Sequence, residues 1–387
     1  MPDVFVIAAQ RSAIGRFGGA FKELTPPALA APIMQKALQL AGVSGEQLDL
    51  VIMGNVLRGG HGQLLPRQAA FLAGIPKHVD ALAVDMVCSS GMAAVMTAAS
   101  QIKAGEADVV LAGGMETMSG AGFALASQAR WGWKYASGGV RIVDLMARDG
   151  LTDPETGDAM GEQTERLIAE EGVGRSELDL VAVASHKRAA AATDSGAFSE
   201  EIAEVGGVTV DEGIRRETTV DSLGSLRPAF RNDGALTAGN SSQISDGAAA
   251  LVLASERAVA EHGLTPLAKI TGSAWAAGEP YRFPEAPIPA VEKLLKREGK
   301  SITDFDLFEN NEAFALNTVL FTRRLGVDPE KLNVNGGAIA LGHPIGCSGA
   351  RILVTLIHSL RNRDASNGLA AICHGTGGGT VTSVELV

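Results

Sequence analysis

Cys88 lies where an apolar stretch of the chain breaks and a helical pattern begins. In the segment VDMVCSSGMAAVMTAASQIKAG, residues 84–105, apolar residues recur after Ser90 with the spacing of one helix face. The free N–H groups of a first helical turn carry partial positive charge, which favours a thiolate over a thiol and lowers the pKa of the cysteine. Cys88 is therefore a candidate nucleophile, and the alternative is an inert, buried cysteine.

A histidine that could act as the base for such a thiol stands in a glycine-rich loop, NVNGGAIALGHPIGCSG, residues 333–349. His343 lies there just before a second helical pattern, and imidazole is the side chain best suited to move protons near neutral pH. A lone histidine is more often structural. His343 with Cys347, Cys373 and His374 also leaves a metal site open, although these residues lack the short spacing of zinc modules.

Three further polar loops follow predicted strands. The loop CHGTGGG, residues 373–379, joins a second thiol to backbone N–H groups that could form an oxyanion hole, unless it is only a turn. The cluster ENNEAFA, residues 309–315, could fix a water or a substrate oxygen, and LTAGNSSQISDGAAA, residues 236–250, could line a narrow tunnel. Ligand sites of α/β sheets lie at the carboxyl ends of parallel strands, so we expect these loops to meet.

The elements that position these loops occur twice in the same plan. Predicted strands at 48–55 and 107–114 flank the Cys88 helix, and strands at 304–311 and 369–375 flank a helix at 347–360. Asn55 precedes Ser90 by 35 residues, and Asn311 precedes Ser348 by 37. Short strands alternating with helices predict βαβ crossovers and an α/β fold of mainly parallel sheets, covered on both faces.

The segment between the two halves, residues 119–244, differs from them in composition. It contains Trp131, Trp133, Tyr135 and many charged residues and glycines. We interpret it as an insertion on the first half that forms a substrate-binding lobe. The expected domains are a first half of residues 1–118 plus 245–265, an inserted lobe of residues 119–244, and a second half of residues 266–387.

Composition narrows the class of protein. The 387 residues are 46% hydrophobic and 20% charged with a net charge of −11, which argues against broad binding to nucleic acid or an anionic membrane. Three cysteines without a CxxC pair indicate a reducing compartment. No apolar run approaches a membrane span, and a strand predicted almost from residue 1 leaves no room for a leader. We therefore expect a cytoplasmic protein.

Together the motifs closely resemble those of the thiolase family, from about Ile7 to Val387. The resemblance is carried by VCSSGMAA around Cys88, by NEAFA, by NVNGGAIALGHPIGCSGAR and by CHGTGGG, with support from ARWGWK, LTAGN and LRPAF. Several separated motifs in the right order are far more specific than any one. The resemblance implies the thiolase fold, in which two duplicated βαβαβαββ halves form α-β-α-β-α layers with an inserted loop domain.

The resemblance also implies catalytic roles. Cys88 would be acylated, and His343 would take its proton and later stabilise a thioester oxygen. Cys373 would be the acid and base at the α-carbon of the second substrate. Asn311 would hold a water that completes an oxyanion hole with His343, and the N–H groups of Cys88 and Gly375 would form the other hole.

The implied substrates are coenzyme A and acyl-CoA, with no metal or redox cofactor. Ser242 would contact the pantetheine of coenzyme A, and Arg215 or Arg216 would contact the nucleotide phosphates. The remaining residues implied at the site are Ala238 and Phe230 for coenzyme A, and Met160, Phe283 and Phe314 for the acyl pocket. The family forms homodimers that often pair into homotetramers through the lobe. Neither nucleic acid nor membrane is an expected partner.

The reaction implied is condensation of two acetyl-CoA to acetoacetyl-CoA, or thiolysis of a 3-ketoacyl-CoA. One alternative is a decarboxylating condensing enzyme of the ketoacyl synthase type, against which Cys373 argues. Another is an inactive acyl-CoA or lipid carrier on the same fold.

Four positions depart from the usual pattern of the family. Asp85 replaces an Asn near the nucleophile, and we expect it to turn away or pair with a cation, because a facing carboxylate would raise the pKa of Cys88. Cys347 replaces an Ala, and Thr376 interrupts a run of glycines. Ala159 replaces a His that is common in acetoacetyl-specific members, which leaves the acyl preference open.

Overall fold

Each half of the chain opens with a long strand, and these two strands join the halves. The computed structural model describes residues 2–135 and 138–387. Strands β1 (Val4–Ser12) and β10 (Ala268–Ala277) pair antiparallel, with Phe5 opposite Lys269 and Val6 opposite Ala268. This short ladder connects the two sheets edge to edge.

The first half has the order βαβαβαββ. Its elements are β1, α1 (Pro26–Ala41), β3 (Leu50–Gly54), α2 (Leu65–Leu72), β4 (Asp80–Val84), α3 (Ser90–Ala104), β5 (Val109–Thr117) and β9 (Ser245–Ser255). The strands lie in the order β4-β3-β5-β9-β1. Strand β9 runs against both neighbours, and the others run in one direction, in keeping with the expected crossovers.

The second half repeats this arrangement. Its elements are β10, α8 (Pro287–Glu298), β11 (Leu307–Asn310), α9 (Ala315–Leu325), α10 (Ala338–Leu341), α11 (Ile345–Asn362), β12 (Asn367–His374) and β13 (Gly378–Leu386). The order β11-β12-β13-β10 matches β3-β5-β9-β1, and an isolated bridge between Phe308 and Leu332 stands where β4 stands in the first half. The duplication predicted from the sequence is confirmed.

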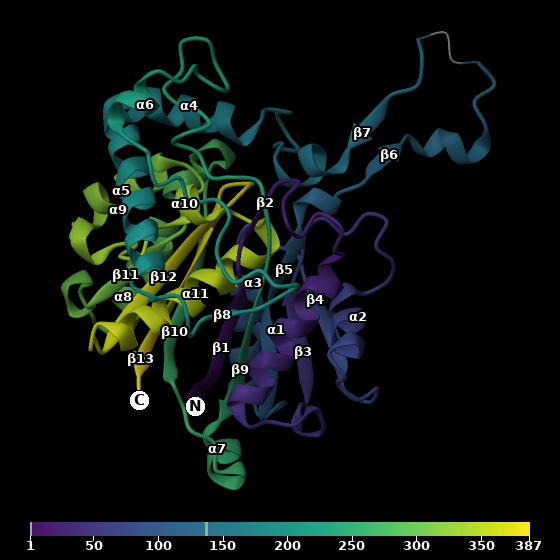
Figure 1. The fold of residues 1–387 in the computed structure, drawn as a ribbon, viewed down its shortest axis with the longest axis vertical. Coiled ribbons are helices and arrows are strands. Elements are labelled where there is room, and N and C mark those ends of the chain that lie inside the picture. The colour runs from purple at the N-terminus through teal and green to yellow at the C-terminus, as the bar shows by residue number, and fades with distance from the viewer. Residues whose placement is uncertain (1, 136–137) are drawn as a thin grey trace.

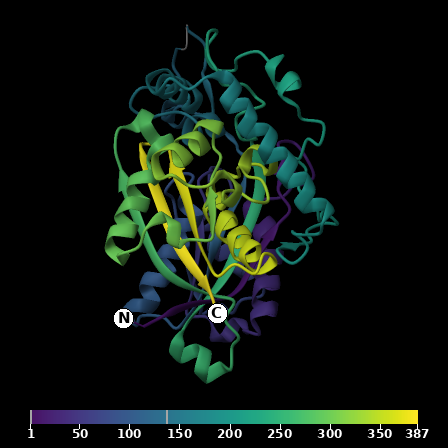
Figure 2. The same ribbon diagram turned by 90° about the vertical axis from the view of Figure 1, so that its left-hand side faces the viewer.

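The helices and sheets form the expected α-β-α-β-α layers (Figures 1 and 2). Helices α1 and α2 cover the outer face of the first sheet, and α8 and α9 cover that of the second. Helices α3 and α11 form the central layer, where they share one apolar core with both sheets. Gly91 of α3 and Gly349 of α11 lie where the helices meet: an added Cβ would come within 2.8 Å of Ala350 N and 2.4 Å of Met92 N, respectively.

The remaining segments project from or cover these layers. They are β2 (Gly15–Arg16), β6 (Phe123–Leu125), β7 (Ile142–Asp144), α4 (Met160–Glu171), α5 (Arg175–Asp194), β8 (Ile202–Ala203), α6 (Val220–Gly224) and α7 (Glu256–His262). The β6–β7 hairpin stands away from the body (Figure 1). The sequence assigned the lobe to the first half, but α4 and α5 pack on the core of the second. None of the described helices has the length and apolar character needed to cross a bilayer.

Candidate active site

The turn before α3 holds Cys88 in a strained local conformation. Val87 has φ +48°, in the left-handed region that β-branched residues rarely adopt. Ser90 Oγ accepts from Met86 N at 2.8 Å and donates to Val87 O at 2.6 Å. One hydroxyl therefore closes the turn and presents the half-buried Cys88 just before the helix.

The electrostatics of Cys88 differ from the prediction. Burial raises the pKa of its thiol to about 12, while the N–H groups of Gly375 and of Cys88 itself act in the opposite direction and the charge of Glu116 raises it further. The sequence-based expectation of a lowered pKa is wrong, because burial outweighs the partial charge of the helix terminus. The N–H of Gly375 nevertheless brings a donor from the second half to the sulfur of the first.

His343 is buried and held at both ring nitrogens. Nδ1 lies 2.5 Å from Ser348 Oγ, which donates to Pro344 O at 2.9 Å, and Asn311 Nδ2 donates to Nε2 at 3.4 Å. Since the hydroxyl proton is used on Pro344, Ser348 accepts from Nδ1–H and Nε2 keeps its lone pair. Burial, assisted by the positive charge of Arg351, lowers the pKa of His343 to about 3. The ring is therefore a neutral base at pH 7.

Asn311 follows β11 and is fully buried. Its Oδ1 has no hydrogen-bond partner within residues 2–135 and 138–387, so it is available to a water or a substrate oxygen.

Cys373 lies near the end of β12 and is buried. Asn317 Nδ2 donates to its sulfur at 3.2 Å and to Pro284 O at 3.1 Å, while Asn317 Oδ1 accepts from Phe314 N at 3.0 Å. Burial raises the pKa of Cys373 well above its ordinary value, and the nearby Cys88 adds to the effect. Both cysteines are therefore thiols at neutral pH.

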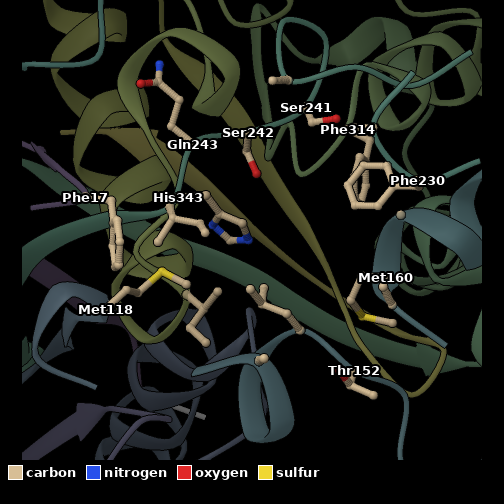
Figure 3. A pocket seen from close by; sticks show the side chains of 18 of the residues that line it. Phe17, Met118, Thr152, Met160, Phe230, Ser241, Ser242, Gln243, Phe314 and His343 are labelled. Carbon is tan, nitrogen blue, oxygen red and sulfur yellow. The ribbon is translucent and has the colours of Figure 1, made fainter. Parts of the chain in front are cut away.

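A cavity of about 680 Å³ leads to these groups (Figure 3). His343 projects into it, and Phe230 and Phe314 lie on its other side (Figure 3). The other predicted residues along its wall are Met160, Arg215, Ala238 and Ser242. Cys88, Cys373, Asn311 and Gly375 do not line it, but Asn311 contacts His343, and an added Cβ on Gly375 would lie 3.1 Å from Met160 Sδ.

Two predicted residues lie outside this wall. Phe283 packs behind Phe314, with ring centroids 6.2 Å apart, so it supports the wall without lining it. Arg216 pairs with Asp194 at 2.7 Å near the surface, whereas the adjacent Arg215 faces the cavity.

The sequence-based reasoning assigned no role to three side chains that the geometry brings to the site. Ser348 holds His343, Asn317 holds Cys373, and Glu116 accepts from the loop that carries His343. A polar residue in the first turn of an otherwise apolar helix could have indicated Asn317.

The departures from the usual family pattern are accommodated. Asp85 pairs with Arg58 at 3.4 Å near the surface, as expected. Cys347 is buried in the central core, and Thr376 has φ +69° at an exposed position. Within the described ranges no three His, Cys, Asp or Glu side chains are grouped to hold a metal ion.

Comparisons with known proteins place the chain in a family. Residues 4–257 match the family model described as thiolase, N-terminal domain, and residues 264–386 match thiolase, C-terminal domain. The acetyl-CoA acetyltransferase of Synechocystis sp. is 60% identical to the chain, and the match covers 100% of both proteins. That of Escherichia coli is 43% identical, and the match covers 100% of this chain and 99% of the relative.

Two solved structures superpose closely. The Bacillus anthracis acetyl-CoA acetyltransferase has a TM-score of 0.96 at 42% identity, covering 100% of this chain and 99% of that one. A thiolase from Ascaris suum in complex with coenzyme A has a TM-score of 0.95 at 37% identity, covering 100% of both chains. With two family models spanning almost its whole length and a duplicated fold that brings Cys88 and Cys373 together, the chain belongs to the thiolase family.

Proposed function

We propose that the chain transfers acyl groups between thioesters through an acyl-enzyme on Cys88. It would condense two acetyl-CoA to acetoacetyl-CoA and coenzyme A, or cleave a 3-ketoacyl-CoA with coenzyme A in the reverse direction. The observation that carries this proposal is that Cys88 from the first half meets Gly375 and the buried Cys373 from the second. Cys88 also packs against the cluster containing Ile345, which lines the same cavity as His343.

The first half-reaction begins with neutral groups. Cys88 gives its proton to Nε2 of His343 as its sulfur attacks the thioester carbonyl. Cys373 protonates the leaving thiolate of coenzyme A and is left ionised, while His343 keeps the proton of Cys88. The N–H groups of Cys88 and Gly375, which approach the Cys88 sulfur, would receive the oxyanion. Losing one such donor costs about 10²- to 10³-fold in rate.

The second half-reaction uses the other thiol. Cys373, ionised in the first half-reaction, removes the α-proton of the second acetyl-CoA. The enolate oxygen is stabilised by Nε2–H of the protonated His343 and by a water held on Asn311. The enolate carbon attacks the acyl group on Cys88, the carbon–carbon bond forms, and the Cys88 sulfur leaves and takes back the proton held by His343. Asn317 supports this step because it donates to the Cys373 sulfur and so favours its ionised form.

Coenzyme A would lie in the 680 Å³ cavity as a substrate. Ser242 and Ala238 would border the pantetheine, Phe230 would pack on it, and Arg215 would face the phosphates. The Ascaris suum neighbour supports coenzyme A as the ligand, because its structure is in complex with coenzyme A. Arg216 would have to leave Asp194 to join Arg215 at the phosphates.

The assembly we propose is a homodimer that pairs into a homotetramer through the β6–β7 hairpin. Trp131 and Tyr135 support it, because they are 82% and 87% exposed on a projecting segment. Light scattering after size-exclusion chromatography would report a smaller assembly for a variant with both residues changed to serine. We also propose a cytoplasmic location, since Cys88 and Cys373 must stay reduced to react.

The deciding experiment measures coenzyme-A-dependent loss of acetoacetyl-CoA and of a longer 3-ketoacyl-CoA, with Cys88→Ala as the control. Cleavage of acetoacetyl-CoA alone identifies an acetyl-CoA acetyltransferase, and cleavage of both identifies a thiolase of broad range. Loss of neither, together with failure to trap a radiolabelled acetyl group on Cys88, would contradict the proposal and favour a carrier.

A further inference from the structure

Glu116 is a buried carboxylate at the end of β5 that bonds to both halves of the molecule. Within the first half, Oε1 accepts from Asn55 Nδ2 at 2.8 Å and from Leu57 N at 3.1 Å, and Oε2 accepts from Val56 N at 3.1 Å. Its fourth donor is Gly346 N, at 2.9 Å from Oε2, in the first turn of α11. This last bond crosses from one half to the other, three residues after His343.

The contact between Glu116 and Gly346 leaves no room for a side chain at position 346. A Cβ added at position 346 would lie 2.6 Å from Glu116 Oε2 and 2.9 Å from the backbone of Asn55. The carboxylate also lies at the amino end of α11, where the helix dipole favours a negative charge. Position and charge together therefore fix the start of α11.

A second buried carboxylate holds the other end of the same loop. Glu312 accepts from Asn333 Nδ2 at 3.0 Å and from Ile339 N at 3.2 Å. Its carboxylate lies within 2.6 Å of where a Cβ on Gly337 would be. The loop from Asn333 to Gly346, which carries His343, is thus tied near both ends to buried acids, one from each half.

The charge of Glu116 does not help the nucleophile. It raises the pKa of Cys88, so it disfavours the thiolate that attacks the substrate. Burial likewise raises the pKa of Glu116 to about 7, although its backbone donors act in the opposite direction. Since both carboxylate oxygens are occupied by four protein donors, Glu116 contributes to turnover through the groups that it positions.

We infer that Glu116 is a positioning residue that holds the first turn of α11, and with it His343, in register with Cys88 across the junction of the two halves. The inference rests on the role proposed above for His343. It adds a residue outside the loops that carry the reacting groups, and it explains why a carboxylate stays buried next to a nucleophile that it disfavours.

Two substitutions of Glu116 separate the effect of its side-chain length from the effect of its charge. Glu116→Asp keeps the charge but is one methylene shorter, so it cannot bond Asn55 and Gly346 together. Glu116→Gln keeps the length but places an amide NH₂ among N–H donors and removes the charge. Asp306→Asn is the matched control, because Asp306 accepts from Ser366 N at 2.9 Å and Asn367 N at 3.1 Å, outside the candidate site.

The measurements are kcat and KM for thiolysis of acetoacetyl-CoA and the rate of Cys88 alkylation by iodoacetamide, with thermal unfolding to confirm folding. A misplacement of about 1 Å costs about 10²-fold, so both Glu116 variants should lose about 10- to 100-fold in kcat with KM changed less. Cys88 alkylation should be faster in Glu116→Gln and unchanged in Glu116→Asp. Asp306→Asn should retain kcat.

The inference is overturned if folded Glu116→Asp keeps the wild-type kcat, or if alkylation falls with kcat in both variants. Should Glu116→Gln fail to fold, Glu116→Asp decides alone. His343→Ala separates the two proposals: if it stays active, the proposed function fails, whereas an inactive His343→Ala beside a fully active Glu116→Asp refutes only the positioning role.

Discussion

The hydroxyl of Ser348 holds His343 in place, and its removal should lower kcat strongly. Ser348 is fully buried, lies 2.5 Å from His343 Nδ1 and donates to Pro344 O at 2.9 Å. Ser348→Ala leaves Nδ1–H buried without its acceptor, which costs about 1–3 kcal/mol of folding stability. His343 also carries a proton during turnover, when the bond becomes charge-assisted and contributes about 1.5–3 kcal/mol. That range corresponds to a loss of about 10- to 150-fold in kcat.

The assay is steady-state thiolysis of acetoacetyl-CoA, with the free energy of unfolding measured in parallel by denaturant titration. Ser359→Ala is the matched control, because Ser359 is buried on the same helix and accepts from Asn335 Nδ2 at 3.0 Å, away from His343. We expect the control to lose stability while kcat stays within about twofold of wild type. A kcat near wild type for Ser348→Ala, or an equal loss in both variants, would refute the assignment of Nε2 as a base oriented through Ser348.

Three further outcomes follow from the geometry. Burial raises the pKa of Cys88 to about 12 and lowers that of His343 to about 3, so both groups are neutral at pH 7. Because only the thiolate reacts, the rate of Cys88 alkylation should rise about tenfold per pH unit from about pH 7 to 9. A plateau near neutrality would instead indicate a thiolate–imidazolium pair. Thr376→Gly should raise the free energy of unfolding by about 1 kcal/mol, because an exposed β-branched residue with φ +69° is strained; an unchanged denaturation midpoint would contradict this. Arg11→Met should lower the free energy of unfolding by about 3–5 kcal/mol in the same titration. The substitution leaves two buried carboxylates, of Glu201 and Asp211, without the guanidinium that they contact at 2.6 and 2.7 Å. A loss below about 1 kcal/mol would count against an ionised, paired cluster.

The parts of the fold that follow from local patterns were predictable. The break in an apolar stretch, followed by helical spacing, located the turn at Cys88, and repeated strand and helix patterns revealed both halves. Strand β4 (Asp80–Val84) was missed, because it is short and only partly buried and so lacks the apolar run of its neighbours. The antiparallel course of β9 and β13 depends on pairing between distant segments, which no local pattern reports.

The site also has residues that the sequence revealed and residues that only the fold brings together. Cys88, His343 and Cys373 carry reactive groups in unusual loops, so type and spacing were enough to select them. Ser348 and Asn317 act only through the side chains that the fold brings beside them. The direction of the Cys88 pKa depends on how much protein surrounds the sulfur, which a sequence segment does not reveal.

The shared central layer also bears on how such a chain could arise. A chain holding a single copy of the repeated unit would leave one face of its central helix uncovered, and a second copy would have to cover it. In such a symmetric pair, every residue would occur at both equivalent places. Joining the copies in one chain removes that constraint, so that the turn before one helix carries Cys88 while the matching turn carries Gly346, whose missing side chain leaves room for Glu116.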